Sequence, residues 1–173
     1  MLAYELLFTE DEGRAAALAM QLQKLNEERQ HLTREAQELV RTELEQREET
    51  DTPLIFASNA AFQPGIVGLV AGRITEEYYR PCIVMREGDD ESSASCRSIP
   101  QFDITQALDQ CADLLVRHGG HAQAAGFTVK NQNVAALRER MESIAQEQLS
   151  GVDLRPTIEI DAMLDIHQLS EEL

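Results

Sequence analysis

The sequence predicts an α/β domain, with a mixed central sheet flanked by helices and preceded by one long connecting helix. Three observations lead to this prediction. No glycine or proline interrupts the stretch from Arg14 to Asp51, which shows helical periodicity. Short apolar runs typical of buried strands then alternate with amphipathic segments. The chain has 173 residues, enough for one hydrophobic core with appendages.

The long helix is predicted over residues 10–48. Thr9 and Glu12 form a capping box ahead of it. An apolar stripe repeats every seven residues, at Leu18, Leu25, Leu32 and Leu39. Such a stripe is typical of a coiled-coil dimer, but also of a helix that connects two domains of one chain. The heptads are few and Arg29 interrupts them, which favours the connecting helix.

Apolar runs and turn residues then predict the remaining elements. The expected order is a strand at 53–58, a helix at 63–79, a strand at 81–85, a turn at 86–91, a strand at 92–99, a helix from Asp103 to the glycine pair, a strand at 124–130 and a helix at 133–149. Pro64 suits the first turn of its helix, because proline lacks only an N–H that would be unpaired there. The strands at 81–85 and 92–99 are expected to form a hairpin.

Asp103 and Gln106 predict the start of the helix that follows the hairpin. Its buried face is expected to carry Ile104, Leu108, Cys111 and Leu115. The Gly119–Gly120 pair is expected to end this helix, since glycine accepts the left-handed conformation of a C-cap.

Three regions follow from these elements: the helix at 1–52, the α/β domain at 53–150, and a linker at 151–173 that leads into a further strand near 157–164. No apolar run is long enough to predict a membrane span, and no secretory signal is expected. The three cysteines form no CxxC pair, so we expect reduced core thiols in a cytoplasmic protein.

The formal net charge of -16 argues against tight nucleic-acid binding, because phosphate affinity comes from Lys and Arg. The acids are unevenly distributed, however. From Ser92 to Lys130 three acids face three bases, and two histidines lie among them. If any part of the chain meets an anion, we expect it to be this part.

Three short segments combine small residues with groups that can bind an anion. Pro64 and Gly65 lie at a helix N-terminus, where free N–H groups favour negative charge, although these glycines also suit helix–sheet packing. Arg97 is carried by a strand, and its guanidinium either contacts phosphate or points into water from an edge strand.

The third segment is Gly119–Gly120–His121, where a glycine pair permits close approach and His121 can donate to an oxygen or exchange a proton. We expect His118 to pair with the end of the preceding helix. No further cysteine or histidine completes a zinc site, and neither a two-metal Asp/His cluster nor a G-x-S-x-G elbow is found.

Four segments in this order resemble the DHH-associated domain of the RecJ family of single-strand-specific 5′→3′ exonucleases: "QPGIVGLVAGRI", "RPCIVM", "SCRSIPQFDITQAL" and "RHGGHAQAAGF". The resemblance covers residues 53–130. The long helix resembles the interdomain helix of that family, and the tail from Arg155 resembles the entry to its OB-fold domain. The glycine-glycine-histidine motif is shared with other DHH phosphodiesterases.

This resemblance implies a domain that binds single-stranded DNA against a separate DHH catalytic domain. That domain would hold Mn²⁺ or Mg²⁺, so the present chain is expected to bind no metal and to be inactive alone. The residues implied in phosphate binding are Arg97, Ser98, Gly119, Gly120 and His121. The family usually has a histidine before Pro64, and Gln63 replaces it here with an effect that stays open.

Two alternatives remain. One is a phosphodiesterase of the DHH superfamily that acts on oligoribonucleotides or cyclic dinucleotides. The other is a non-enzymatic module that dimerises through the long helix. The connecting-helix interpretation predicts a monomer with no membrane partner, involved in DNA repair and recombination.

Overall fold

The centre of the fold is a five-stranded mixed sheet. The computed structural model describes residues 1–47, 52–157 and 160–168. The strands are β1 (Ile55–Asn59), β2 (Cys82–Arg86), β3 (Glu91–Arg97), β4 (Leu115–His121) and β5 (Ala124–Lys130), in the spatial order β1-β2-β3-β5-β4. The β1–β2 pair is parallel and the other three are antiparallel, which confirms the predicted mixed sheet.

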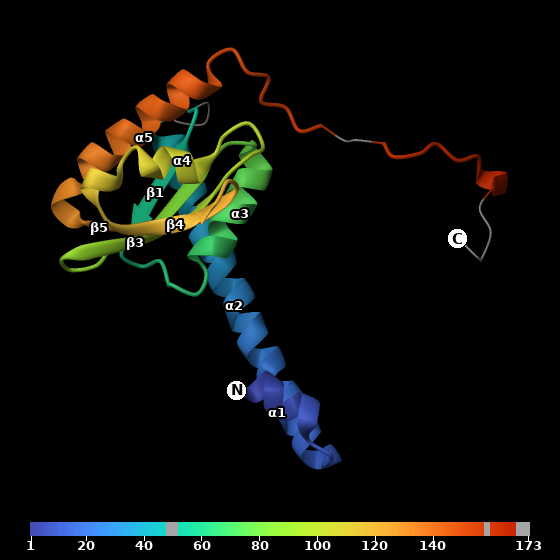
Figure 1. The fold of residues 1–173 in the computed structure, drawn as a ribbon. Coiled ribbons are helices and arrows are strands. Elements are labelled where there is room, and N and C mark those ends of the chain that lie inside the picture. The colour runs from blue at the N-terminus through green and yellow to red at the C-terminus, as the bar shows by residue number, and fades with distance from the viewer. Residues whose placement is uncertain (48–51, 158–159, 169–173) are drawn as a thin grey trace.

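Helices pack on both faces of this sheet (Figure 1). The described helices are α1 (Leu2–Phe8), which lies away from the sheet, and α2 (Glu12–Gln46), α3 (Val67–Tyr78), α4 (Ile104–Asp109) and α5 (Val134–Leu149), with short 3₁₀ turns at Ala112–Leu114, Asn131–Asn133 and Ile166–Gln168. Because strand side chains alternate between faces, Phe56 belongs to the core under α4 and α5. Its neighbours Ile55 and Ala57 belong to the core under α2 and α3.

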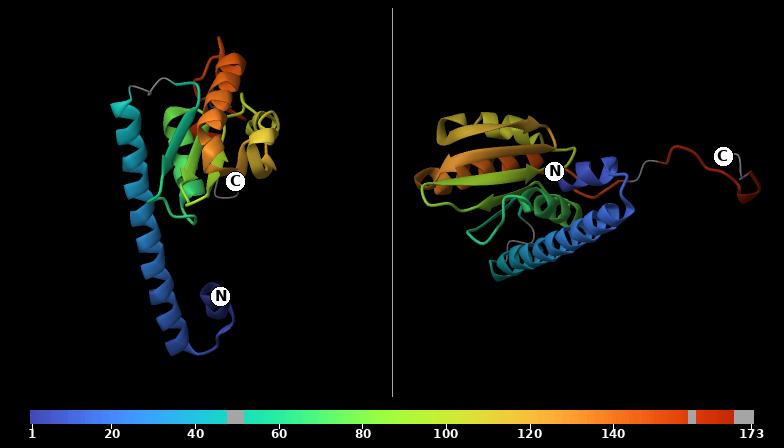
Figure 2. Two further views of the ribbon diagram at one scale, coloured as in Figure 1. Left: turned by 90° about the vertical axis from the view of Figure 1, so that its left-hand side faces the viewer. Right: turned by 90° about the horizontal axis from the view of Figure 1, so that it is seen from below.

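The long helix α2 has two different halves. Its C-terminal half packs against α3 through Ala36, Val40 and Leu44, a helical i, i+4, i+8 stripe. Its N-terminal half extends straight beyond the sheet, and α1 folds back along it (Figures 1 and 2). The predicted leucine stripe is therefore only partly used: Leu18 is fully buried, whereas Leu39 remains 45% exposed.

The ends of α2 also differ from the prediction. Asp11 is the N-cap, and its carboxylate accepts a hydrogen bond from the Arg14 N–H at 2.8 Å. Thr9 instead follows α1, a helix that the sequence pattern did not predict. The expected end of the helix at residue 48 lies outside the described residues.

The segment 103–121 differs most from the predicted structure. Asp103 caps α4 as predicted, accepting from the N–H groups of Thr105 and Gln106. The helix ends at Asp109, however, and residues 115–121 form strand β4. Gly119–Gly120 is thus not a helix C-cap, and His118 is not a helix-end residue. The prediction failed because Ile104, Leu108, Cys111 and Leu115 have helical spacing by coincidence.

The other predicted elements are confirmed with small shifts. The strands at 53–58, 81–85, 92–99 and 124–130 correspond to β1, β2, β3 and β5, and β2 and β3 form the expected hairpin. Helix α3 begins only at Val67 with Ile66 as its N-cap, so the prediction that Pro64 lies in the first turn of this helix is wrong: Pro64 lies in the turn that precedes it. All three cysteines are free and buried, as expected. The predicted tail strand is not present at residue 157 or at 160–164, and residues 158–159 lie outside the described part.

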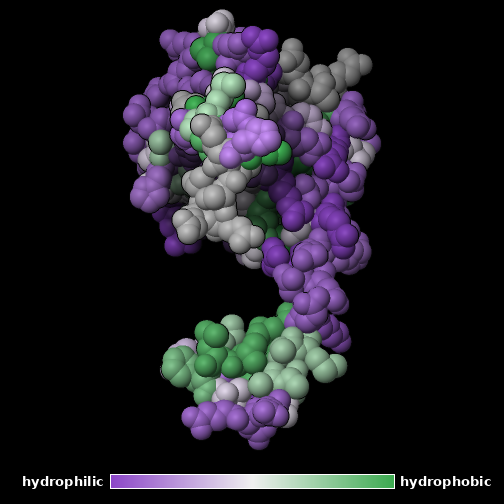
Figure 3. Space-filling view, turned by 90° about the vertical axis from the view of Figure 1, so that its right-hand side faces the viewer, coloured by the Kyte–Doolittle hydropathy of each residue, from purple (hydrophilic) through white to green (hydrophobic). Residues whose placement is uncertain are grey.

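Apolar side chains gather on α1 and the adjoining part of α2 (Figure 3). The exposed members are Met1, Tyr4, Leu7, Phe8 and Met20. No helix in residues 1–47, 52–157 or 160–168 combines the length and the apolar character needed to span a membrane.

Candidate functional site

The candidate site is one face of β3, β5 and β4, on the side of the sheet that carries α3. Helix α3 packs on β2 and β3, so it reaches only part of this face. We call the rest the open face. By strand alternation and register it carries Ser93, Ser95, Arg97, Arg117, Gly119, His121, Ala124, Gly126 and Thr128. Their neighbours of opposite parity, such as Cys96 and Phe127, are buried in the core with α4 and α5.

Arg97 ends β3 and lies against the glycine face of α3. A Cβ built on Gly68 would lie 3.3 Å from Nη2 of Arg97, and one on Gly72 would lie 4.0 Å from its Cγ. These glycines therefore leave room for the arginine. Its Nη1 donates to the Cys96 carbonyl at 2.9 Å. Within the described residues no carboxylate pairs with Arg97. Because β3 lies between β2 and β5, the edge-strand alternative is wrong.

His121 is brought into line with Arg97 by the sheet. Arg97 pairs with Ala124 across β3 and β5, and Ala124 pairs with His121 across β5 and β4. The two side chains thus occupy one row on the open face, two strand spacings or about 10 Å apart. The His121 carbonyl accepts from the Thr105 hydroxyl at 2.8 Å, which fixes this end of β4 to the first turn of α4.

The two glycines before His121 have different structural roles. Gly120 has φ +153°, and a Cβ there would lie 2.4 Å from the Ala124 carbonyl oxygen. The backbone therefore requires glycine at this position. Gly119 faces Gly126 across the strands, and a Cβ at 119 would meet no atom within 4 Å. Gly119 leaves a flat, accessible stretch of backbone on the open face.

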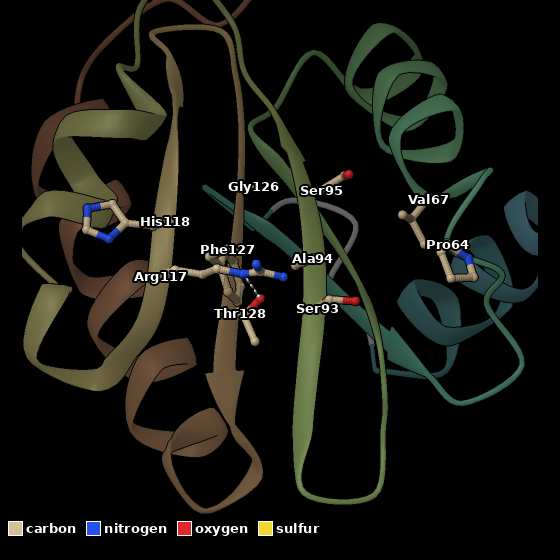
Figure 4. Close-up of a pocket in the computed structure, with 10 residues that line it drawn as sticks. All are labelled: Pro64, Val67, Ser93, Ala94, Ser95, Arg117, His118, Gly126, Phe127 and Thr128. Atoms are coloured by element: carbon tan, nitrogen blue, oxygen red, sulfur yellow. Dashed lines mark hydrogen bonds between the residues drawn. The ribbon is translucent and has the colours of Figure 1, made fainter.

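Arg117 also lies on the open face, a position that the sequence pattern did not predict. A register shift between Leu115 and Arg117 marks a β-bulge in β4. The bulge places Arg117 opposite Thr128 on the open face, where its Nε donates to the Thr128 hydroxyl at 3.1 Å. Figure 4 shows the Arg117 guanidinium extending across β5 toward β3.

His118 points to the other side of β4 (Figure 4). Its Nε2 lies 2.8 Å from Oδ1 of Asp109, the last residue of α4. His118 therefore holds β4 against the C-terminal end of α4. It does not share the side of the strand that carries His121.

The remaining predicted residues surround this face in different ways. Ser98 is buried, with 8% of its surface exposed, and its hydroxyl donates to the Phe102 carbonyl at 2.6 Å. Its predicted phosphate contact stays a prediction. Pro64 lines a depression of about 350 Å³ above the open face, and Gly65 is exposed nearby in the turn before α3.

The depression is bounded by α3 on one side and β4 on the other (Figure 4). Its lining residues are Pro64, Val67, Ser93, Ala94, Ser95, Arg117, His118, Gly126, Phe127 and Thr128. Hydroxyl groups and one guanidinium dominate its polar part, and no carboxylate lines it. This composition suits an anion. Ser93, Ser95 and Thr128 were missed together with Arg117, although the alternation of "SSASCR" marks the serines and Arg97 as one strand face.

The donor set does not fit a metal site. Among the described residues, no three side chains of His, Cys, Asp or Glu converge. His118 is engaged with Asp109, and His121 lies on the other face of β4. Divalent metals in catalytic sites need several oxygen or nitrogen ligands together, and the described residues bring no such set together.

Comparison with known proteins adds an independent finding. Residues 51–147 match the family model of the DHHA1 domain. The chain is 35% identical to the single-stranded-DNA-specific exonuclease RecJ of Bacillus subtilis over 98% of its own length, and 33% identical to that of Thermus thermophilus over 83%. These alignments cover 22% and 20% of the relatives, so the chain spans about a fifth of their length.

Two solved structures share the fold. The crystal structure of RecJ in complex with Mg²⁺ from Thermus thermophilus gives a TM-score of 0.75 at 32% identity, over 84% of this chain and 22% of that one. The crystal structure of exonuclease RecJ bound to manganese gives 0.73 at 32% identity, over 88% of this chain and 38% of that one.

Proposed function

Since the chain belongs to the DHHA1 domain family, we propose that it is the substrate-binding part of a RecJ-like exonuclease that hydrolyses single-stranded DNA from the 5′ end. The open face would bind DNA phosphates opposite a DHH catalytic domain. Solved relatives contain Mg²⁺ or manganese, and the donor set described above gives such an ion no place on this face. We therefore propose that the metal belongs to the catalytic domain.

One observation carries this proposal: the sheet register places Arg97 and His121 in a single row on the open face. A guanidinium without a carboxylate partner attracts a phosphate and can bind it through two parallel N–H groups. An imidazole on the far side of the same phosphate can donate one further hydrogen bond. Two donors about 10 Å apart at their backbones can reach one phosphate group from opposite sides.

The glycines between these residues have a matching role. Gly119 exposes flat backbone, and the turn with Pro64 and Gly65 borders the face on the α3 side. A sugar-phosphate backbone could therefore approach the sheet closely. In this proposal the chain binds and orients the phosphodiester, while water activation and bond cleavage occur at the catalytic domain. The chain alone is then inactive but still binds DNA. This binding is weak because the overall negative charge of the chain repels phosphate.

The test is binding of a fluorescent 5′-phosphorylated oligothymidylate to the chain at low salt, measured by anisotropy. Arg97→Gln and His121→Gln should each weaken binding, by about tenfold for Arg97 if one charge-assisted contact is lost. Arg140→Gln on α5 removes the same charge from the opposite side of the sheet, and should bind like the parent. Equal affinity for Arg97→Gln, His121→Gln and the parent would refute the proposal. Manganese-dependent digestion of the DNA by the isolated chain would refute its assigned inactivity.

The alternative of a small-substrate phosphodiesterase is less favoured, because the relatives that match nearly the whole chain are single-stranded-DNA-specific exonucleases. The other alternative was a non-enzymatic module that dimerises through the long helix. We propose instead that the chain is a monomer in the cytoplasm. The C-terminal half of α2 already uses its apolar stripe within the chain, against α3. Sedimentation equilibrium distinguishes this from a dimer.

A further inference from the structure

We propose that Arg117, Thr128 and the β3 serines form a second phosphate-binding position on the open face, which holds a more distant phosphate of the same DNA strand. This inference rests on the proposed function and extends it from one phosphate to a track. Arg97 is in register with Ala124, whereas Arg117 is in register with Thr128. Four residues along β5 separate the two positions by about 13 Å.

The bulge in β4 creates this second position. Leu115 pairs with Val129 and faces the core, so without an extra residue Val116 would pair with Thr128 and Arg117 with Phe127. Arg117 would then point into the apolar core under α4. The extra residue reverses the alternation and places the guanidinium on the open face instead. Bulges are used in this way to re-aim a side chain beside functional sites.

The Arg117 side chain is oriented by Thr128, and its terminal N–H groups remain available to a ligand. Its Nε donates to Thr128, which fixes the direction of the side chain across β5 (Figure 4). The terminal Nη1 and Nη2 groups have no carboxylate partner among the described residues. Ser93 and Ser95 project from β3 on the same face, and all three side chains line the depression. A guanidinium with neighbouring hydroxyl groups is suited to the oxygens of a phosphate.

The charges at the end of the sheet limit the track. Beyond Ser93 on the same face comes Glu91, which is in register with Lys130. Asp89 and Asp90 lie in the turn beside them. A DNA strand that runs along β5 from the row of Arg97 and His121 would therefore meet the Arg117 guanidinium first and the carboxylates of residues 89–91 after it. The favourable path covers this stretch of the open face and ends there.

The ligand chemistry is the DNA backbone rather than the bases. No residue of the open face is aromatic except the imidazole of His121, so the stacking platforms usual in base-binding proteins are missing from it. Donors and small side chains contact phosphate and sugar without regard to sequence. A separation of about 13 Å corresponds to about four nucleotides of a stacked strand at 3.4 Å each, and to fewer in an extended strand.

The experiment compares oligothymidylates of two and eight nucleotides, both 5′-phosphorylated, in anisotropy titrations at several salt concentrations. Arg97→Gln should weaken the binding of both lengths, because the first position is always occupied. Arg117→Gln should weaken the binding of the eight-nucleotide strand by about tenfold and leave the dinucleotide unchanged. The salt slope for the long strand should fall by about 0.7, the loss expected for one phosphate contact.

Two further variants make the result specific. Arg117→Lys keeps the charge without the bond to Thr128, and should retain the salt slope for the long strand. Arg140→Gln should leave both lengths unaffected, with circular dichroism melts showing that each variant is folded. If Arg117→Gln binds the long strand like the parent while Arg97→Gln does not, the second position is refuted and the proposed function survives. If Arg117→Gln weakens both lengths equally, both arginines contact one phosphate and the track is refuted. If neither arginine matters, the proposed function itself fails.

Discussion

The pair Gly119 and Gly120 gives the most direct test of the structure, because adjacent glycines are predicted to respond oppositely to the same substitution. In Gly120→Ala, the new Cβ would lie 2.4 Å from the Ala124 carbonyl oxygen and 2.5 Å from the Ala125 Cα. Both are backbone atoms of β5, which cannot rotate away as a side chain could. The residue would also keep φ near +153°, a region that L side chains rarely adopt.

The size of the effect follows from these two terms. A side chain in a sparsely populated backbone region costs about 1–3 kcal/mol, and overpacking costs about 1–3 kcal/mol. Strand β4 is at the edge of the sheet and can shift outward, which relieves part of the clash. We therefore expect Gly120→Ala to lower the free energy of unfolding by about 3 kcal/mol, or Tm by roughly 6–12 °C for a domain of this size.

Gly119→Ala is the matched control. Its Cβ would meet no heavy atom within 4 Å, and alanine restricts the unfolded chain, so stability should stay equal or rise by about 0.4–1 kcal/mol. Urea unfolding followed by circular dichroism measures both variants, with unchanged m values as the check on two-state behaviour. Similar unfolding midpoints for the two variants would refute the assigned β4–β5 register. The same Gly119→Ala protein should bind single-stranded DNA more weakly, since its methyl group occupies the open face.

Two further predictions concern the core and the hairpin. Asn131 donates to the carbonyls of Gly88 and Asp89 at 2.8 and 3.0 Å and accepts from the Ser92 hydroxyl at 2.7 Å. Asn131→Ala should therefore lower the free energy of unfolding, measured in urea, by about 2 kcal/mol. A loss below about 0.5 kcal/mol, on the order of a neutral surface change, would contradict this role. Burial raises the pKa of the Cys96 thiol to about 12 and also raises that of Cys82. Because the folded-state pKa is raised above an unfolded value of about 8.5, stability is full below that pH and should fall by about 1.4 kcal/mol per pH unit for each thiol above it. Cys96→Ala should remove the part of this decline that its thiol contributes, about 1.4 kcal/mol per pH unit, and an unchanged decline in unfolding experiments between about pH 9 and 11 would exclude the thiol as a cause.

The fold could be predicted from sequence where one period dominated. The run "PLIFAS" and the amphipathic residues 133–149 were assigned correctly because burial on one or both faces leaves a clear pattern. Strand β4 could not be assigned in this way. Its bulge interrupts the two-residue alternation, its glycines have low strand propensity, and Leu115 continues a helical spacing from α4. Tertiary pairing with β5 decides the conformation of this segment.

The residues of the candidate site were also only partly predictable from the sequence. Arg97 and His121 were proposed from the sequence because a strand-borne arginine and a glycine-flanked histidine are unusual in themselves, and the structure places both on the open face. Arg117 was missed because its orientation depends on the bulge. The charge of the whole chain does not describe the open face either. The acids that dominate the total of -16 belong mainly to residues 1–52 and 131–173, and much of that repulsion is screened beyond about 8 Å at physiological salt.

Glycine at position 119 supports the proposal of a ligand on the open face. A strand face that met only water would be stabilised by threonine or another branched polar residue, and glycine there weakens the strand. Gly126 has a steric reason, since a Cβ there would lie 3.1 Å from the Ala94 carbonyl oxygen, and Gly120 has both a steric and a conformational one. Gly119 has neither. Its lack of a side chain is unnecessary for the fold, but in the proposed function it would let a DNA backbone approach between Arg117 and His121.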